Sequence, residues 1–312
     1  MQTRPGTGRD VGARPPRLRR SRQVGAALLL ATVLFVPLVQ PGWADNGPAG
    51  QVEQPAPASG LRALRAAIQE RLAAAGGQWS VSVGVPGVPE TTIALNADRT
   101  VIAASLFKLV LLVEALRLQR AGELDLDERL AMTPRAVAIL RPLPVILRVG
   151  ETMPAAVAVE RMITVSSNTG AVLVGERVGW RRSQETVARL GLHATSMASP
   201  PMTTAADMQR LLRLIAGEPA DPQLLHPDDA AVMRYLLSQQ RINDRVPPEL
   251  LQAGLIAHKT GDLTQLLHDA GLVTGPGGPI AVVLMATDFP SRQGAVAAMV
   301  DVYRLLYTAA VG

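Results

Sequence analysis

Strand-forming patterns occur near the two ends of this chain, and a long stretch with helical patterns separates them. Valines alternate over Trp79–Val85, and a second strand is predicted near Thr91–Asn96, across a turn rich in Pro and Gly. Residues 105–239 have almost wholly helical patterns. Three more strands are predicted on either side of Gly-Pro-Gly-Gly at 275–278, which has the composition of a hairpin turn. They are Leu255–Gly261, Ala270–Thr274 and Ile280–Ala286.

Two helices are predicted at the outer ends of this pattern. One has Leu61 as its first core-facing residue and ends at Gly76-Gly77, and the other covers Arg292–Thr308. The simplest assembly is an α+β fold, in which a five-stranded antiparallel sheet carries the terminal helices on one face. The helical block, about residues 105–240, would then form a second lobe inserted between the strands. Boundaries between such lobes commonly hold small molecules.

Two helix starts are predicted within the helical block. Thr152 is expected to cap a helix that begins with Pro154, because Thr is a common N-cap and Pro is favoured in the first turn. Thr204 is expected to cap a helix over Ala205–Ala216. Both helices would belong to the second lobe.

Residues 1–44 have the composition of a secretory signal peptide. They contain seven Arg and one Asp, an apolar run at Val24–Val39, and the small-x-small end Gly42-Trp43-Ala44. A membrane-spanning helix needs about 20 apolar residues, so we expect cleavage and export, with a membrane-anchored form if the leader is retained. Residues 45–60 are rich in Pro, Gly and Ala and are predicted to be a flexible linker, which leaves residues 61–312 as the folded domain.

The charge of the remaining chain argues against a nucleic-acid partner. The full chain has 31 basic and 26 acidic side chains. Without the leader's seven Arg and one Asp, 24 basic and 25 acidic side chains remain, a net charge of −1. Such a domain has no cationic excess to attract phosphates, which favours a small-molecule substrate over a nucleic acid. We also expect a monomer. The chain has no Cys, which excludes disulfides and a thiol nucleophile.

Lys is used at two positions in the whole chain, Lys108 and Lys259, whereas Arg supplies the other 29 basic side chains. The difference matters because a buried Lys can lose its proton and act as a base, whereas Arg keeps its charge. Lys108 lies in the apolar stretch 105–113, where a solvated charge is unexpected. We therefore interpret the two lysines as candidate functional residues.

Ser105 precedes Lys108 by three residues, which gives a Ser-x-x-Lys motif at the start of a predicted helix. Residues at i and i+3 share a face of a helix, so the ammonium group can reach the hydroxyl. The N-terminus of the helix would also stabilise negative charge that develops on the substrate. On its own the motif is weak, because a Ser at this place is often a helix cap.

Two further short motifs lie later in the chain. Ser166-Ser167-Asn168 falls between two predicted helices, where a hydroxyl can relay a proton and an amide can hold a Lys or a substrate carbonyl. Taken alone it would be an ordinary capping cluster. Lys259-Thr260-Gly261 ends a predicted strand, where a Lys and a hydroxyl can bind a carboxylate and Gly lets the substrate backbone approach.

Together and in this order, the three motifs resemble those of class A β-lactamases and penicillin-binding proteins. The resemblance covers most of residues 61–312 and implies a β-lactamase/transpeptidase-like catalytic domain. It implies Ser105 as the acylated nucleophile, Lys108 as its general base and Ser166 as a proton relay. The substrate would be a β-lactam or a D-Ala-type peptide, and no metal or cofactor is required.

The resemblance also implies a substrate-binding set. Asn168 would bind both Lys108 and the substrate, and Lys259 with Thr260 would bind the substrate carboxylate, beside Gly261. The oxyanion hole would consist of the backbone N–H groups of Ser105 and Asp262. Arg241 and Arg245 are both candidates for additional positive charge at the carboxylate site.

Two features depart from the family pattern. Ser167 stands where the family usually has Asp, which we expect to change the loop and leave the chemistry intact.

Class A enzymes also carry a Glu on a loop between the second and third motifs, where it directs water onto the acyl-enzyme. Here Val187–Ala206 contains no Asp or Glu, and both Glu185 and Asp207 lie in predicted helices. His193 is the one titratable side chain of that stretch able to act as a base near neutral pH, although a lone His in a loop is more often a surface residue.

Three functions remain open from the sequence. The protein could be a class A-like β-lactamase with another deacylating group, or a D,D-peptidase or esterase-like hydrolase that β-lactams acylate and that releases them slowly. The third is a non-catalytic penicillin-binding sensor, against which the intact Ser-x-x-Lys motif argues.

Overall fold

A computed structural model describes residues 58–140 and 146–311, which all belong to one compact unit, Asp45–Gly312. The predicted signal peptide lies outside the described residues, as does the predicted linker up to residue 57. Residues 58–60, which we assigned to the linker, form the first turn of helix α2 (Ala58–Ala75). This turn adds Ala58, Ser59 and Gly60 to the helix before its first core-facing residue, Leu61.

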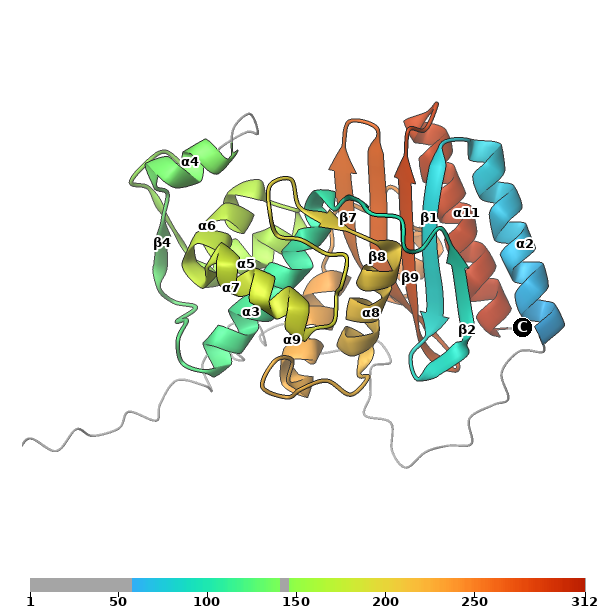
Figure 1. Cartoon of the computed structure of the whole chain (residues 1–312), viewed down its shortest axis with the longest axis horizontal. Helices are drawn as coiled ribbons and strands as arrows, with labels where there is room; N and C mark the ends of the chain where they lie inside the picture. Colours follow the sequence, from blue (N-terminus) through green and yellow to red (C-terminus); the bar gives the residue numbers. More distant parts are fainter. Residues whose placement is uncertain (1–57, 141–145, 312) are drawn as a thin grey trace, which may run out of the picture. The chain divides into compact units, whose positions relative to one another are not determined.

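The sheet is five-stranded and antiparallel, with the order β2-β1-β9-β8-β7 (Figure 1). The early and late strands join where β1 pairs with β9, so the two ends of the chain build one sheet, as predicted. The turn at 275–278 is also confirmed, since Gly275 pairs with Gly278. The strands are β1 (Gln78–Val85), β2 (Val88–Leu95), β7 (Ile256–Leu263), β8 (Leu266–Gly275) and β9 (Gly278–Thr287).

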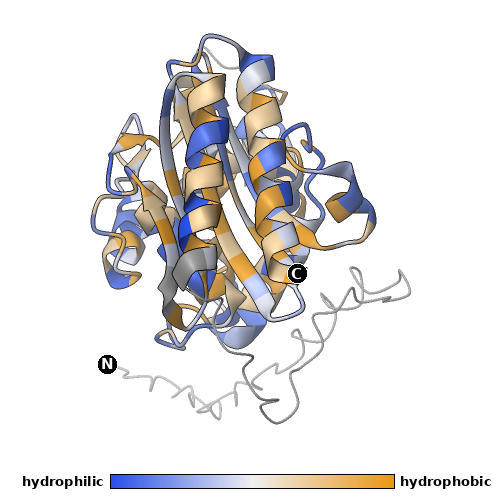
Figure 2. Cartoon of the chain, turned by 90° about the vertical axis from the view of Figure 1, so that its right-hand side faces the viewer, coloured by the Kyte–Doolittle hydropathy of each residue, from blue (hydrophilic) through white to orange (hydrophobic). Residues whose placement is uncertain are grey.

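Helices cover both faces of the sheet. Helices α2 and α11 (Arg292–Val311) lie side by side on one face (Figure 2), where their apolar residues meet those of the strands. Helix α8 (Ala205–Ala216) packs against β1, β8 and β9 on the other face. This explains why all of Trp79–Gly84 is buried, although the alternating valines suggest a strand with one exposed face.

The second lobe is helical, as predicted, and lies beside β7 (Figure 1). Two short strand pairs within or next to it carry no sequence pattern long enough to predict: β3 (Val101–Ile102) with β6 (Met202–Thr203), and β4 (Arg129–Ala131) with β5 (Thr152–Pro154). Besides α8 and a 3-10 turn η1 (Ala104–Phe107), the lobe and its connections contain α3 (Lys108–Arg120), α4 (Pro134–Leu140), α5 (Ala155–Thr164), α6 (Asn168–Val178), α7 (Trp180–Arg189), α9 (Pro227–Ser238) and α10 (Pro248–Gln252).

One of the two predicted helix caps is correct and the other is wrong. Thr204 caps α8, because its hydroxyl accepts a hydrogen bond from Asp207 N. Thr152 does not cap α5: it pairs with Ala131 in the β4–β5 ladder, and its hydroxyl accepts a hydrogen bond from Arg129. Thr152 therefore belongs to the strand that precedes α5, which begins at Ala155 after Pro154 and has no side-chain cap.

Gly170 allows α5 and α6 to approach closely, which fixes the loop between them. Replacing Gly by Ala inside a helix normally stabilises it by about 1 kcal/mol. At Gly170, however, the added Cβ would lie 2.6 Å from Ala158 O. We therefore expect Gly170→Ala to lower the free energy of unfolding by about 1–3 kcal/mol, measured by urea denaturation.

Gly294→Ala in α11 is the matched control. There the nearest atom would lie 3.6 Å from the added Cβ, an ordinary contact, so the substitution should be neutral or stabilising. Equal effects of the two substitutions would contradict this account of the α5–α6 packing.

Candidate active site

Ser105 lies in η1, a tight turn that leads directly into α3. The backbone before it is held from two sides, since Ala103 N donates to Pro201 O at 2.8 Å and His268 Nε2 lies 3.0 Å from Ile102 O. Ala104, the residue before Ser105, has φ +46, a left-handed conformation that is costly for a residue with a side chain. These contacts hold the Ser105 hydroxyl at the boundary between the sheet and the helical lobe.

Lys108 is 0% exposed and lies among oxygen atoms. Its Nζ is 2.9 Å from Ser105 Oγ, 2.6 Å from Ser166 O and 2.9 Å from Asn168 Oδ1. Burial, and then the charge of Lys259, hold the pKa of Lys108 well below its usual range. A neutral amine fits this environment, because its two N–H groups can donate to the two carbonyl oxygens while its lone pair faces the Ser105 hydroxyl.

Ser166 stands between the two lysines. It lies in the loop between α5 and α6 with φ +54, a left-handed conformation that places its side chain in the cleft. Its Oγ is 3.2 Å from Lys108 Nζ and 2.9 Å from Lys259 Nζ. The neighbouring Ser167 caps α6 by accepting a hydrogen bond from Gly170 N, so it supports the loop that positions Ser166.

Lys259 reaches Ser166 from β7 and is also 0% exposed. Burial lowers its pKa to about 7, opposed by the charges of Asp269 and Asp262 and reinforced by that of Arg245. Within the described residues, no Asp or Glu oxygen lies within 4.0 Å of Lys108 Nζ or Lys259 Nζ. The neighbouring Thr260 Oγ1 is buried and has no hydrogen-bond partner among the residues that the structure describes. A cation without an anionic partner beside an unpaired hydroxyl can bind a carboxylate.

Gly261 lets β7 lie against the segment that carries Ser105. A Cβ at this position would be 3.3 Å from Ala104 Cβ and 3.4 Å from Ala103 O, closer than most real contacts. Because Gly261 has no side chain, the backbone of Gly261 and Asp262 can lie next to η1. This is where an oxyanion hole is expected. Three segments from distant parts of the chain thus meet around Ser105 and Lys108.

The comparisons with known proteins agree with this arrangement. The model of the beta-lactamase enzyme family matches residues 63–310. The chain belongs to this family. A search of curated proteins finds no match.

Solved structures show the same fold at low identity. A beta-lactamase from Sphaerobacter thermophilus has 23% identity and a TM-score of 0.68, and the match covers 82% of this chain and 98% of that one. PBP-A has 24% identity and a TM-score of 0.67, with 80% and 96% covered. An ancestral class A beta-lactamase has 24% identity and a TM-score of 0.65, with 79% and 99% covered.

This family member carries no acidic side chain on the loop between α7 and α8. Glu185 lies in α7, as predicted, and it pairs with Arg181 at the surface. Asp207 is buried in α8, where it accepts hydrogen bonds from Ala194 N and from the Thr195 hydroxyl. His193 is exposed on the loop. Both neighbouring acids therefore have structural partners.

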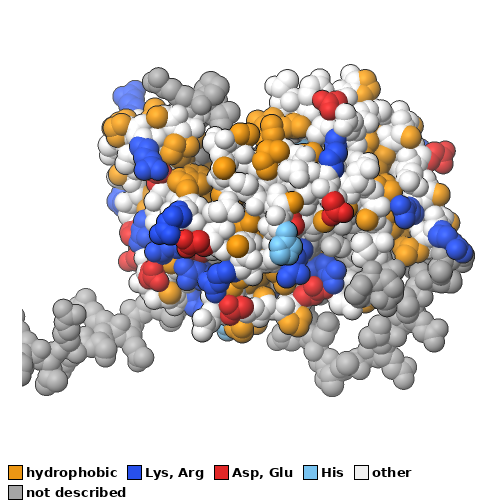
Figure 3. Space-filling model, in the orientation of Figure 1, with side chains coloured by type: hydrophobic (Ala, Val, Ile, Leu, Met, Phe, Trp, Pro, Cys, Tyr) orange, Lys and Arg blue, Asp and Glu red, His pale blue; other side chains and the backbone are white. Residues whose placement is uncertain are grey.

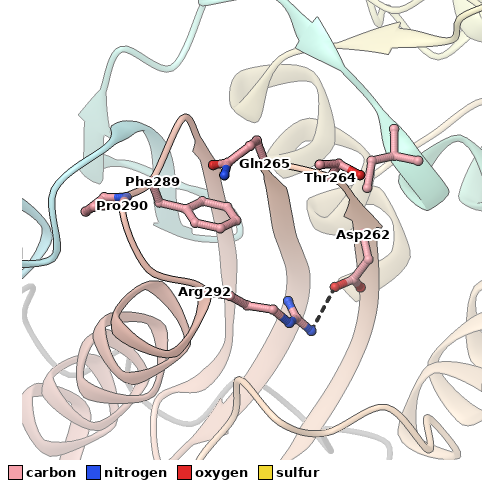
Figure 4. Close-up of a pocket in the computed structure, with 7 residues that line it drawn as sticks. Asp262, Thr264, Gln265, Phe289, Pro290 and Arg292 are labelled. Atoms are coloured by element: carbon pink, nitrogen blue, oxygen red, sulfur yellow. Dashed lines mark ion pairs between the residues drawn. The ribbon is translucent and has the colours of Figure 1, made fainter.

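Asp262 connects the site to a cavity of about 450 Å³ at the end of β7 (Figure 4). Its side chain lies 2.9 Å from Arg245 and 3.1 Å from Arg292, and both guanidinium groups also pair with Asp244. Arg245 is fully buried and also donates to His268 O, so it is held as a support of β7. Arg241 is exposed, 4.0 Å from Glu160. The sequence did not reveal this set of four charges, since its members are spread over three elements.

The two lysines allow a direct test of the site's electrostatics. Protein isotope-labelled at Cε of lysine should give two resonances, assigned with Lys259→Arg. We expect one to titrate with a midpoint of about 7, because burial disfavours the charged form of Lys259. The Lys108 midpoint should also lie well below the value of the urea-unfolded protein. If both lysines titrate with the same midpoints in the folded and the unfolded protein, they are not buried without an anionic partner as described.

Proposed function

We propose that this protein is a serine hydrolase that forms an acyl-enzyme on Ser105 with β-lactams or related acyl substrates. The observation that carries the proposal is the position of Lys108, a buried amine 2.9 Å from the Ser105 hydroxyl with a pKa well below its usual range. Burial makes such an amine easier to deprotonate than an exposed lysine, so it can act as a general base. A non-catalytic sensor would not need this pairing of base and nucleophile.

The acylation step follows from these contacts. Lys108 takes the proton of Ser105 Oγ while Oγ forms a bond to the substrate carbonyl carbon. The negative charge moves to the carbonyl oxygen, which the backbone N–H groups of Ser105 and Asp262 would stabilise. Lys108 then passes a proton across the 3.2 Å contact to Ser166, whose hydroxyl donates its own proton to the leaving nitrogen as the C–N bond breaks.

Substrate binding would rest on Asn168, Lys259 and Thr260. Lys259 has no anionic partner and the Thr260 hydroxyl has no hydrogen-bond partner among the described residues, so the two suit a carboxylate. β-Lactams and D-Ala-type peptides both carry a carboxylate next to the bond that breaks. On the face shown in Figure 3, acidic and basic side chains are intermixed. This distribution favours a small-molecule substrate over a nucleic acid.

Release of the acyl group is proposed to be slow. Deacylation requires a base that directs water onto the ester, and the loop between α7 and α8 offers no carboxylate for this task. This favours a D,D-peptidase or esterase-like hydrolase over a fast β-lactamase. A mutant of PBP-A, which has the same fold, has been solved as an acyl-enzyme complex with penicillin G.

The test is to incubate the protein with a penicillin and to follow intact mass and substrate turnover together. We expect one adduct per chain, located on Ser105, that persists for many minutes with little turnover. Ser105→Ala should abolish it. Ser199→Ala, which removes an exposed hydroxyl from the loop between α7 and α8, should leave it unchanged. Fast turnover without an adduct would contradict slow release, and no reaction at all would contradict the covalent mechanism.

We also propose that the protein is exported by its N-terminal leader. The proposal rests on the Arg-rich start, the apolar run Val24–Val39 and the small residues Gly42 and Ala44. Protein expressed at full length in a bacterial host should be recovered outside the cytoplasm with Asp45 as its first residue, determined by N-terminal sequencing. Recovery from the cytoplasm with an intact leader would contradict export.

A further inference from the structure

His258, the residue before Lys259, is a buried histidine with a partner on each ring nitrogen. Its ring is 1% exposed. Its Nδ1 lies 2.9 Å from Asp269 Oδ1, and its Nε2 lies 2.9 Å from Asn243 Oδ1. The other oxygen of Asp269 accepts a hydrogen bond from the Tyr303 hydroxyl at 2.6 Å. These contacts join β7, β8, α11 and the connection that follows α9.

The hydrogen-bond partners determine where the protons lie. Asn243 Nδ2 donates to Gln240 O at 3.0 Å, so its Oδ1 must face His258, and His258 Nε2 must carry a proton. Tyr303 remains a donor, because burial and then Asp269 raise its pKa well above the usual range. A proton is also needed between His258 Nδ1 and Asp269 Oδ1, since two lone pairs would otherwise face each other across 2.9 Å.

Several charged groups face Lys259 from the surrounding elements. Asp269 on β8 and Asp262 on β7 favour its charged form, whereas Arg245 opposes it. Lys108 on α3 is a second amine nearby. His268 on β8 is also close to β7, but burial lowers its pKa, so it is neutral near neutral pH. Asp269 is the strongest of the groups that favour a charged Lys259, and His258 bonds directly to it.

We propose that His258 and Asp269 form a buried imidazolium–carboxylate pair that positions β7 and controls how readily Lys259 carries a positive charge. Both are then positioning residues of the carboxylate site, a role that rests on the proposed function. Asp269 favours the charged form of Lys259, and a protonated His258 hydrogen-bonded to Asp269 would offset part of that effect. Burial is the main cause that lowers the pKa of Lys259 to about 7, so a change in the charge of this pair would alter its protonation near neutral pH. A substrate carboxylate would supply the missing anion and complete its protonation.

The pair makes opposite predictions for its two members. Asp269→Asn removes the negative charge, so the Lys259 midpoint should fall by about one pH unit. His258→Gln removes the positive charge, so the midpoint should rise by a similar amount, about one pH unit. Tyr303→Phe is the matched control, because it removes one hydrogen bond to Asp269 and no charge. It should move the midpoint by less than about half a unit.

The measurement is the titration of the isotope-labelled Lys259 resonance in each variant, whose folding is checked by circular dichroism. This readout needs no acylation, so it separates the present proposal from the proposed function. If wild-type protein forms no adduct on Ser105, the proposed function fails, and the lysine midpoints still test the pair. Midpoints that do not move, or that move in the same direction in Asp269→Asn and His258→Gln, would overturn the pair's role.

A second measurement uses the wild-type protein and therefore does not depend on how the variants fold. The chain has four histidines, so ring-nitrogen labelling gives a small set of signals. We expect one ring to carry protons on both nitrogens above neutral pH, and Asp269→Asn should remove that signal. Four neutral rings under these conditions would overturn the ion pair.

Acylation kinetics provide the functional readout where Ser105 reacts. In Asp269→Asn, the lower Lys259 midpoint should weaken binding of a penicillin carboxylate at neutral pH by roughly fivefold, as a higher KM with little change in the limiting acylation rate. Loss of the limiting rate with an unchanged KM would contradict a role through Lys259.

Discussion

The burial of an amine without an acidic partner is the constraint on which the rest of this site depends. Lys108 is enclosed by α3, α5 and α6, and its neighbours are a hydroxyl, a backbone carbonyl and an amide oxygen. A carboxylate in the same place would keep the lysine charged and unable to accept a proton. Burial disfavours the charged form of Lys108, and this lets the amine act as a base. Burying the amine costs free energy of folding, which the packing of the surrounding lobe must offset.

The fold meets this constraint by bringing together segments that are far apart in the sequence. The Ser105 turn follows the first two strands, Ser166 follows α5, and Lys259 lies on an edge strand built late in the chain. Each segment has a local feature that lets it approach: left-handed backbone at Ala104 and Ser166, and a missing side chain at Gly261. The strain at the first two residues persists because the surrounding contacts leave the backbone no alternative.

Much of the fold could be predicted because the long elements have a clear period. Short motifs also pointed to Ser105 as the candidate nucleophile and to both lysines. The rest could not, for identifiable reasons. Strands of two or three residues, such as β3 and β5, show no period. The predicted start of β8 at Ala270 missed His268 and Asp269, since two adjacent polar residues are typical of a loop. In the structure they are buried in the strand and tolerated there because Ile102, His258 and Tyr303 bond to them.

The two lysines have different proposed roles, and the charged groups around them differ accordingly. In the proposed mechanism Lys108 accepts the Ser105 proton, and its Nζ contacts three uncharged oxygens while burial and the charge of Lys259 lower its pKa. Lys259 would have to be charged when it binds a carboxylate, and Asp269 and Asp262 favour its charged form without pairing with it directly. Each of these two carboxylates has a partner of its own, Arg245 for Asp262 and His258 for Asp269. In the proposed mechanism, a substrate carboxylate would supply Lys259 with the direct anionic partner that it lacks among the described residues.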